Sequence, residues 1–268
     1  MPSLRIEFPG SLGVPLAARF DLPDTPPRAF ALFAHCFTCS KDSRAPAHIG
    51  KTLVEQGIAL LRFDFTGLGG SEGEFENTSF SSNVTDLVVA ADWLRREYAA
   101  PSVLIGHSFG GAAVLAAAGG IPESRAVVTM NAPFSPEHVT NLFADGRAQI
   151  EREGEATVSI GGRAFKVKRE FLLDLTTQRQ AERIRDLRRA LLIMHGPTDA
   201  VVGIGNATAI FMAAMHPKSF VALDGADHLL LRAEDARYAA QVMAAWVGRY
   251  LPPANAALEV HARTMTEQ

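Results

Sequence analysis

The amino-acid sequence predicts an α/β fold, with a mainly parallel sheet of eight strands flanked by helices. Short, continuous apolar runs recur along the chain, which is typical of strands buried on both faces of a parallel sheet. Segments with helical periodicity, rich in alanine and leucine, separate most of these runs. The long interval 134–189 interrupts the alternation and predicts an inserted segment.

The first two expected strands form a pair around the turn at 9–13, and the later strands mostly alternate with helices. The expected strands cover residues 4–8, 15–22, 29–35, 58–65, 102–108, 126–132, 190–196 and 219–224. The expected helices, mostly bounded by glycine, proline or capping residues, cover residues 46–56, 80–98, 109–119, 205–215 and 234–250.

The interval 134–189 has a pattern of its own. Its stretch EATVSIGGRAFKVK alternates about a central Gly-Gly pair, which suits a hairpin with a two-residue turn. Pairing Ile160 with Arg163 would put the apolar side chains of both strands on one face: Ala156, Val158, Ile160, Phe165 and Val167. With helical flanks over 136–151 and 169–188, the interval is interpreted as a cap; the alternative is a structural excursion remote from any site.

The expected organisation is an α/β core of residues 1–133 and 190–251, an inserted cap of residues 134–189, and a tail of residues 252–268. The tail follows two consecutive prolines and is expected to be an arm, a linker or a disordered end.

Charge and hydropathy exclude two classes of partner. With 26 Lys and Arg residues against 29 Asp and Glu, the net charge is −3, which gives no broad positive field for nucleic acid or anionic lipid. No apolar stretch approaches the roughly 20 residues that a membrane span needs, and the opening MPSLRIEFPG lacks the pattern of a signal peptide. We therefore expect a cytoplasmic protein that binds neither nucleic acid nor membrane.

The strongest functional signal is GHSFG at residues 106–110, which fits G-x-S-x-G between an expected strand and an expected helix. The chain must reverse so sharply at Ser108 that side chains two positions before and after it would clash, which explains the two glycines. The turn places the serine hydroxyl at a helix N-terminus, where a developing anion is favoured. The motif therefore predicts a nucleophilic serine.

A serine nucleophile needs a base, and the base needs an orienting acid. Asp199 and His228 suit the roles of acid and base, because each follows an expected strand and lies at the carboxyl edge of the sheet. Rival carboxylates either lie too near this histidine in sequence or precede the nucleophile: Asp224, Asp227, Asp64 and Asp86. The remaining histidines considered are expected to be structural: His35, His107, His195 and His216.

Two further motifs suggest other functions. Cys36 and Cys39, with His35 in front, form a C-x-x-C that suits a redox dithiol or a metal site. Turn-forming residues follow, and no second C-x-x-C supplies more ligands, so no metal or cofactor is expected; a redox protein remains the alternative from another class. The stretch GLGGSEG at 67–73 lacks the last glycine of a dinucleotide loop and the lysine of a P-loop.

The motifs GHSFGG, HGPTDAVV, GADHLL and FDFTGLGGSEG resemble those of the α/β-hydrolase superfamily over nearly all of residues 15–250. AHCFTCSKD and RFDFTGLGGSEGEF are similar to the hydrolase part of bacterial proteins in which such a domain precedes an OsmC-like peroxidase domain. The inserted segment resembles the cap of cinnamoyl and feruloyl esterases. The resemblance implies an α/β-hydrolase fold and a tail at which a C-terminal OsmC-like domain begins or has been lost.

The expected activity is hydrolysis of short or medium acyl esters, or aryl esters, through an acyl-enzyme on Ser108. The backbone N–H of Phe109 and, by the resemblance, that of Phe37 would hold the oxyanion, with Cys36 as the alternative donor. The residues expected to line an apolar substrate pocket are Phe134, Leu142, Phe143 and Phe171. Thioesterase, peptidase or amidase chemistry on the same residues stays open, and the protein is expected to be a monomer or homodimer.

Overall fold

The computed structural model describes residues 2–37 and 39–251, and its largest feature is an eight-stranded sheet in the order β1-β2-β4-β3-β5-β6-β9-β10. The strands are β1 (Ser3–Pro9), β2 (Pro15–Asp21), β3 (Ala29–Ala34), β4 (Ile58–Phe63), β5 (Val103–His107), β6 (Ala126–Met130), β9 (Ala190–His195) and β10 (Lys218–Ala222). β2 pairs antiparallel with β1 and β4, and all later neighbours pair parallel. The predicted fold class is therefore confirmed.

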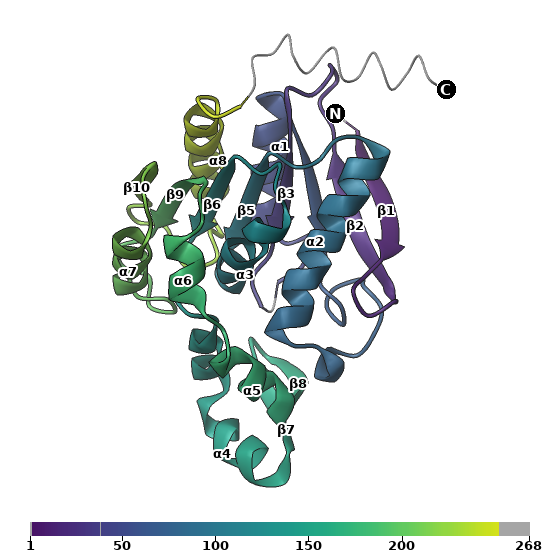
Figure 1. Ribbon diagram of the computed structural model, residues 1–268, viewed down its shortest axis with the longest axis vertical. Helices are drawn as coiled ribbons and strands as arrows, with labels where there is room; N and C mark the ends of the chain where they lie inside the picture. Colours follow the sequence, from purple (N-terminus) through teal and green to yellow (C-terminus); the bar gives the residue numbers. More distant parts are fainter. Residues whose placement is uncertain (1, 38, 252–268) are drawn as a thin grey trace.

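Helices cover both faces of this sheet (Figure 1). On one face α2 (Phe80–Glu97), α3 (Phe109–Ala117) and α7 (Gly205–Ala213) contribute to one apolar cluster, and on the other α1 (Arg44–Glu55) and α8 (Ala233–Val247) contribute to a second. Consecutive strand residues alternate between the clusters, as the period of a strand requires: Leu32 and Leu104 belong to the first, Phe33 and Ile105 to the second. The continuous apolar runs are thus explained by burial on both faces.

Most of the 134–189 segment lies at the lower end of the molecule in Figure 1, whereas its last helix lies higher, beside the sheet. It contains η3 (Pro136–Phe143), α4 (Ala144–Glu153), β7 (Glu155–Ile160), β8 (Arg163–Lys168), α5 (Arg169–Thr176) and α6 (Gln180–Arg185). The hairpin has the predicted register, with Ile160 opposite Arg163 and Val158 opposite Phe165. All five apolar side chains predicted for its inner face are buried.

The helix expected over 169–188 is interrupted between α5 and α6. The hydroxyls of Thr176 and Thr177 donate to the carbonyls of Leu173 and Asp174, which gives the end of α5 local side-chain partners. The sequence pattern also missed two short 3₁₀ turns, η1 (Phe75–Asn77) and η2 (Ala118–Gly120). These differences arise because short turns depend on local hydrogen bonds more than on apolar periodicity.

The carboxyl ends of β5, β9 and β10 lie along the same edge of the sheet, because the strands between them are parallel. The loops that carry the predicted site residues therefore meet there. Within the described ranges, no helix is long and apolar enough to cross a membrane. The predicted tail, residues 252–268, lies outside the described residues.

Candidate active site

A strained turn connects β5 to α3 at Ser108. Ser108 has φ 53° and ψ −124°, a backbone conformation that residues with a side chain rarely adopt. A Cβ on Gly106 would lie 2.3 Å from the carbonyl oxygen of Gly110, and one on Gly110 would lie 2.3 Å from the carbonyl oxygen of Ala34. Both glycines of the motif are therefore required, and the reason is the predicted steric one.

The structure brings Ser108, His228 and Asp199 together in one chain of hydrogen bonds. His228 Nε2 lies 3.0 Å from Ser108 Oγ, and His228 Nδ1 lies 2.7 Å from Asp199 Oδ2. Because a carboxylate can only accept, Nδ1 carries the hydrogen, which leaves the lone pair of Nε2 facing the serine hydroxyl. The Asp199 side chain is fully buried, whereas 10% of the His228 side chain remains exposed.

Asp199 is held as a carboxylate by its partners. Its Oδ1 accepts from the backbone N–H groups of Val201 and Val202, at 2.8 and 3.0 Å, while its Oδ2 faces His228. Burial raises the pKa of Asp199, but the hydrogen bonds from His228 and these N–H groups outweigh it and leave the pKa below its ordinary value. The acid therefore stays ionised while it orients the imidazole.

Two of the rival carboxylates, Asp227 and Asp86, accept hydrogen bonds from loop residues instead. Asp227 accepts from backbone N–H groups of its own turn, at Leu229 and Leu231. Asp86 accepts from the N–H and hydroxyl of Thr66. The His195 ring likewise donates to the backbone carbonyl of Val202, at 2.7 Å, and so holds the loop that carries Asp199.

Two residues that sequence reasoning did not place in the site hold its loops together. His107 Nε2 and Asn131 Nδ2 both donate to the backbone carbonyl of His228, at 2.7 and 2.9 Å. Asn131 Oδ1 accepts from the N–H of Gly196, at 2.9 Å, in the loop that leads to Asp199. Asn131 is fully buried and has φ 46°, a strained conformation for a residue with a side chain. Its side chain thereby bridges the loops that carry His228 and Asp199.

His107 is buried beside His228. Burial, and secondarily the neighbouring His228, lowers the pKa of His107 to about 4. His107 is therefore neutral near pH 7. A neutral imidazole carries one ring hydrogen, which is enough for the bond that Nε2 donates to the carbonyl. The sequence signal that could have found Asn131 is an asparagine directly after β6, the strand between those that lead to the serine and to the acid.

The two expected oxyanion donors lie on adjoining segments. Phe109 is the first residue of α3, where a backbone N–H has no acceptor within its own helix. Phe37 follows β3, and its ring centroid lies 5.3 Å from that of Phe109. Cys36, the alternative donor, is buried and forms a disulfide with Cys39, a bond that was not predicted from the sequence.

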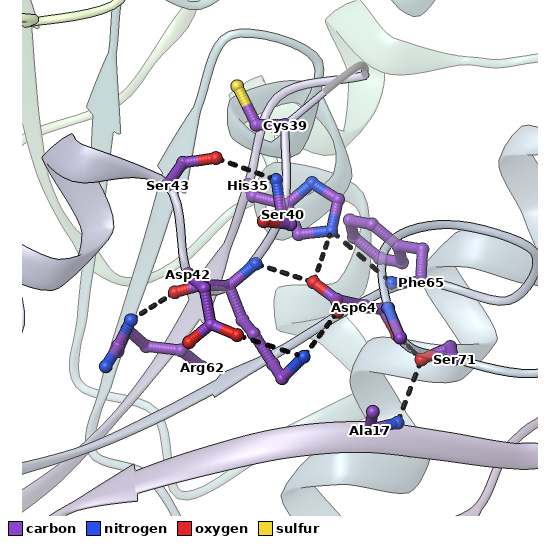
Figure 2. A network of polar contacts seen from close by, with 12 residues as sticks. Ala17, His35, Cys39, Ser40, Asp42, Ser43, Arg62, Asp64, Phe65 and Ser71 are labelled. Carbon is purple, nitrogen blue, oxygen red and sulfur yellow. Dashed lines mark hydrogen bonds and ion pairs between the residues drawn. The ribbon is translucent and has the colours of Figure 1, made fainter.

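A buried carboxylate anchors the segment after β3, which we call the oxyanion loop and define as residues 35–37 and 39–43 (Figure 2). Asp64 accepts from the backbone N–H of Lys41 at 2.5 Å, from Lys41 Nζ at 2.7 Å and from the N–H of Gly70 at 2.8 Å. A Cβ on Gly69 would lie 2.2 Å from Asp64 Oδ2. The glycine-rich stretch therefore wraps a carboxylate of its own chain, which explains why it resembles an anion-binding loop.

Aromatic rings join the oxyanion loop to the 134–189 segment. The Phe37 ring lies 6.1 Å from Phe165 on β8 and 5.9 Å from Phe171 on α5, and the Phe75 ring lies 5.2 Å from Phe165. Among the other expected pocket residues, Phe143 is buried, Phe134 is partly buried against the same cluster, and Leu142 is 37% exposed. Buried Phe143 and Phe171 would thus support a pocket wall, whereas Leu142 presents an open apolar surface.

Solved structures show the same architecture. The chain is 48% identical to the esterase domain of a Rhodothermus marinus protein, with 94% of this chain and 100% of that chain covered and a TM-score of 0.78. Est1E from Butyrivibrio proteoclasticus, in its structure with bound ferulic acid, is 23% identical over 89% of this chain and 97% of that chain, with a TM-score of 0.73. The second likeness shows the fold alone.

Sequence comparisons agree. A short match, 40% identical over 62 residues, links 22% of the chain to 25% of the uncharacterized protein RP471 of Rickettsia prowazekii. The chain thus spans about a quarter of that protein's length. A family model described as the alpha/beta hydrolase family matches residues 31–241, which is most of the chain. The protein belongs to the α/β hydrolase family.

Proposed function

We propose that the protein hydrolyses carboxylic esters through an acyl-enzyme on Ser108. The observation that carries this proposal is the hydrogen-bonded chain from Ser108 Oγ through the His228 ring to Asp199, at a strained strand–helix turn. The 48% identity to an esterase domain over nearly the whole chain supports the same reaction class.

The acylation step uses the lone pair on His228 Nε2. Ser108 Oγ attacks the ester carbonyl carbon while its proton passes to Nε2, and the C–O bond to the alcohol breaks as Nε2 returns that proton to the leaving oxygen. Asp199 holds the ring in the tautomer that makes this possible and stabilises the imidazolium. The N–H groups of Phe109 and Phe37 would stabilise the oxyanion.

Deacylation repeats the sequence with water. His228 takes a proton from the water, the resulting hydroxide oxygen attacks the acyl carbon, and Ser108 leaves with the proton that Nε2 returns. The carboxylic acid is released and the three side chains are restored. No external oxidant, reductant or cofactor enters this balance.

The aromatic surroundings favour esters with apolar or aryl acid groups. The rings of Phe37, Phe75, Phe165 and Phe171 form one cluster that links the oxyanion loop with the hairpin and α5. We infer that the 134–189 segment acts as a cap that supports one wall of the acyl pocket. The structure of Est1E with ferulic acid makes hydroxycinnamate esters a natural substrate panel alongside alkyl esters.

The test is hydrolysis of p-nitrophenyl acetate and butyrate by Ser108→Ala. Loss of the nucleophile is expected to lower kcat by at least about a thousandfold. Ser159→Ala is the matched control, because Ser159 is an exposed hairpin residue and its loss should leave kcat unchanged. A fluorophosphonate probe should label the wild type and Ser159→Ala but not Ser108→Ala.

The same assay separates hydrolysis from dithiol redox chemistry. The Cys36→Ala/Cys39→Ala double variant should retain much of the esterase activity, because the sulfurs take no part in the acyl transfer. Activity that survives in Ser108→Ala, or labelling of another residue, would overturn the serine mechanism.

A further inference from the structure

Cys36, Cys39 and His107 gather beside the nucleophile. One ligand atom from each lies within 4.8 Å of those from the other two. Cys36 and His107 are buried and Cys39 is partly buried, and His107 directly precedes Ser108. The sequence suggested His35 as the neighbour of the cysteines, but the His35 ring contacts the carbonyl of Cys36 and the N–H of Phe65 instead.

We propose that reduction of the Cys36–Cys39 disulfide creates a binding site for one Zn²⁺ ion, with two thiolates and the His107 ring as ligands. Two thiolates and an imidazole are a donor set that zinc uses in sites with three protein ligands and one open position. Soft thiolates also favour zinc over Mg²⁺ or Ca²⁺.

The hydrogen bonding of His107 suits a ligand. Its Nε2–H donates to the backbone carbonyl of His228 at 2.7 Å, so its Nδ1 carries the free lone pair. Metal-binding histidines characteristically donate their other ring N–H to a carbonyl or carboxylate, which fixes the ring. His107 therefore has the outer partner of a metal ligand before any metal binds.

The spacing of the loop is compatible with tetrahedral binding. The two cysteine Cα atoms are 5.2 Å apart, within one C-x-x-C loop. Zinc–sulfur bonds of about 2.3 Å at tetrahedral angles separate two sulfurs by about 3.8 Å, which rotation of the cysteine side chains can supply once the S–S bond is broken. The disulfide and the metal site are thus alternative states of the same residues.

The chemical balance needs an external thiol reductant. A dithiol gives two electrons and two protons to the S–S bond, which becomes two thiols, while the dithiol becomes a disulfide. Zn²⁺ then displaces both thiol protons as the two Zn–S bonds form. Binding would draw Cys36 and His107 together next to the oxyanion donors, so we expect the metal to inhibit hydrolysis; only this consequence rests on the proposed esterase function.

The test is titration of the phosphine-reduced full chain with Co²⁺, a spectroscopic substitute for zinc. One equivalent should produce a thiolate-to-cobalt charge-transfer band that Zn²⁺ abolishes by competition. Cys39→Ser should weaken binding at least tenfold. His107→Gln, whose amide can still donate to the His228 carbonyl, should weaken binding at least tenfold and change the cobalt spectrum. The control His138→Gln removes a half-buried histidine outside the cluster and should bind like the wild type.

Oxidised wild-type protein should give no thiolate band, and Zn²⁺ should inhibit p-nitrophenyl butyrate hydrolysis only after reduction. Cobalt binding that is unchanged in Cys39→Ser, in His107→Gln or in the oxidised protein would overturn the site. Metal binding without inhibition would overturn the inhibitory effect alone. The cobalt spectra decide the site even if Ser108 is not the nucleophile, so the two failures are distinguishable.

Discussion

At the scale of single residues, the geometry of the site depends on groups outside the predicted triad. The carbonyl of His228 accepts from both His107 and Asn131, and Asn131 also receives the N–H of Gly196. The backbone groups that these side chains contact lie far away in the sequence; His107 and His228, for example, are 121 residues apart. Motif spacing predicted the serine, the base and the acid, but it could not reveal residues that act by holding backbone groups in place.

Asn131→Ala tests this bridge. It leaves the N–H of Gly196 without its side-chain acceptor and the His228 carbonyl with one donor fewer, so stability should fall by about 1–3 kcal/mol. We expect kcat for p-nitrophenyl butyrate to fall about tenfold to a hundredfold, because the loop that carries His228 is no longer held in position, while KM changes little. Urea unfolding and steady-state kinetics measure the two effects.

Asn131→Gly is the matched control for strain, since glycine accepts φ 46° without cost but makes neither side-chain bond. It should lose activity like Asn131→Ala. Wild-type activity in the glycine variant would show that the side-chain bonds do not position the loops.

His107 predicts a pH dependence of stability. Burial lowers the pKa of His107 to about 4 in the folded protein from its ordinary value of 6.5, so the unfolded chain binds the proton more readily. Stability is therefore lost as pH falls from 6.5 towards 4, and His107 alone accounts for about 3 kcal/mol, at 1.36 kcal/mol per pKa unit. Urea unfolding of the wild type and His107→Gln at several pH values should show a shallower acid loss in the variant; parallel curves would contradict this.

At the scale of elements, hydrogen bonds from Lys41 to Asp64 anchor the oxyanion loop (Figure 2). Asp64→Asn removes the buried charge partner of Lys41 and leaves only the half-exposed Asp42 beside that side chain, which is only 11% exposed. Breaking a buried pair in this way should cost about 3–5 kcal/mol and loosen the loop that carries the Phe37 N–H. We expect a lower melting temperature and a lower kcat.

Asp42→Asn is the control for the Asp64 prediction, because Asp42 also pairs with Lys41 but its side chain is 49% exposed. Its loss should cost no more than about 1 kcal/mol. Equal destabilisation by the two substitutions would show that the buried Asp64 contacts do not anchor the loop.

Elements with a strong period were predictable from the sequence, and elements defined by local bonds were not. Burial on both faces made the central strands readable as apolar runs, and the Gly-Gly turn set the hairpin register. The break between α5 and α6 depends on hydroxyl-to-carbonyl bonds, and the Gly69 turn depends on contact with Asp64. Such contacts lie outside any periodic pattern.

At the scale of the whole molecule, the 134–189 segment is tied to the core by its later helices. The N–H and hydroxyl of Ser81 on α2 donate to Asp174 on α5, at 2.8 and 2.5 Å, and Gln180 on α6 donates to the carbonyl of Ala112 on α3 at 2.9 Å. α4 packs on the hairpin so tightly that a Cβ on Gly146 would lie 2.4 Å from Val158 Cγ1. α4 and the hairpin therefore form one packing unit.

Replacing residues 144–168 with a short Gly-Ser linker would test this unit. η3 and α5, which it connects, contact each other, so the ends can be joined while the α5 and α6 contacts remain. The excision variant should stay folded, and the fluorophosphonate probe should still label Ser108. Because the rings of Phe37 and Phe75 would lose their contact with Phe165, the variant should discriminate less between acyl chains. The control replaces the Gly-Gly turn with Asn-Gly, which keeps the hairpin.

The measurement is kcat/KM across alkyl and aryl p-nitrophenyl esters. In the wild type and the turn control, the apolar wall should favour one range of acid groups, whereas excision should flatten that preference by at least about tenfold, the effect of about 1.4 kcal/mol of lost contact. An unchanged profile in a folded, labelled excision variant would place acyl selection in the loops of the core. Far-ultraviolet circular dichroism and the labelling reaction are essential to this comparison, because a flattened profile means loss of the wall only if the serine and its sheet remain intact.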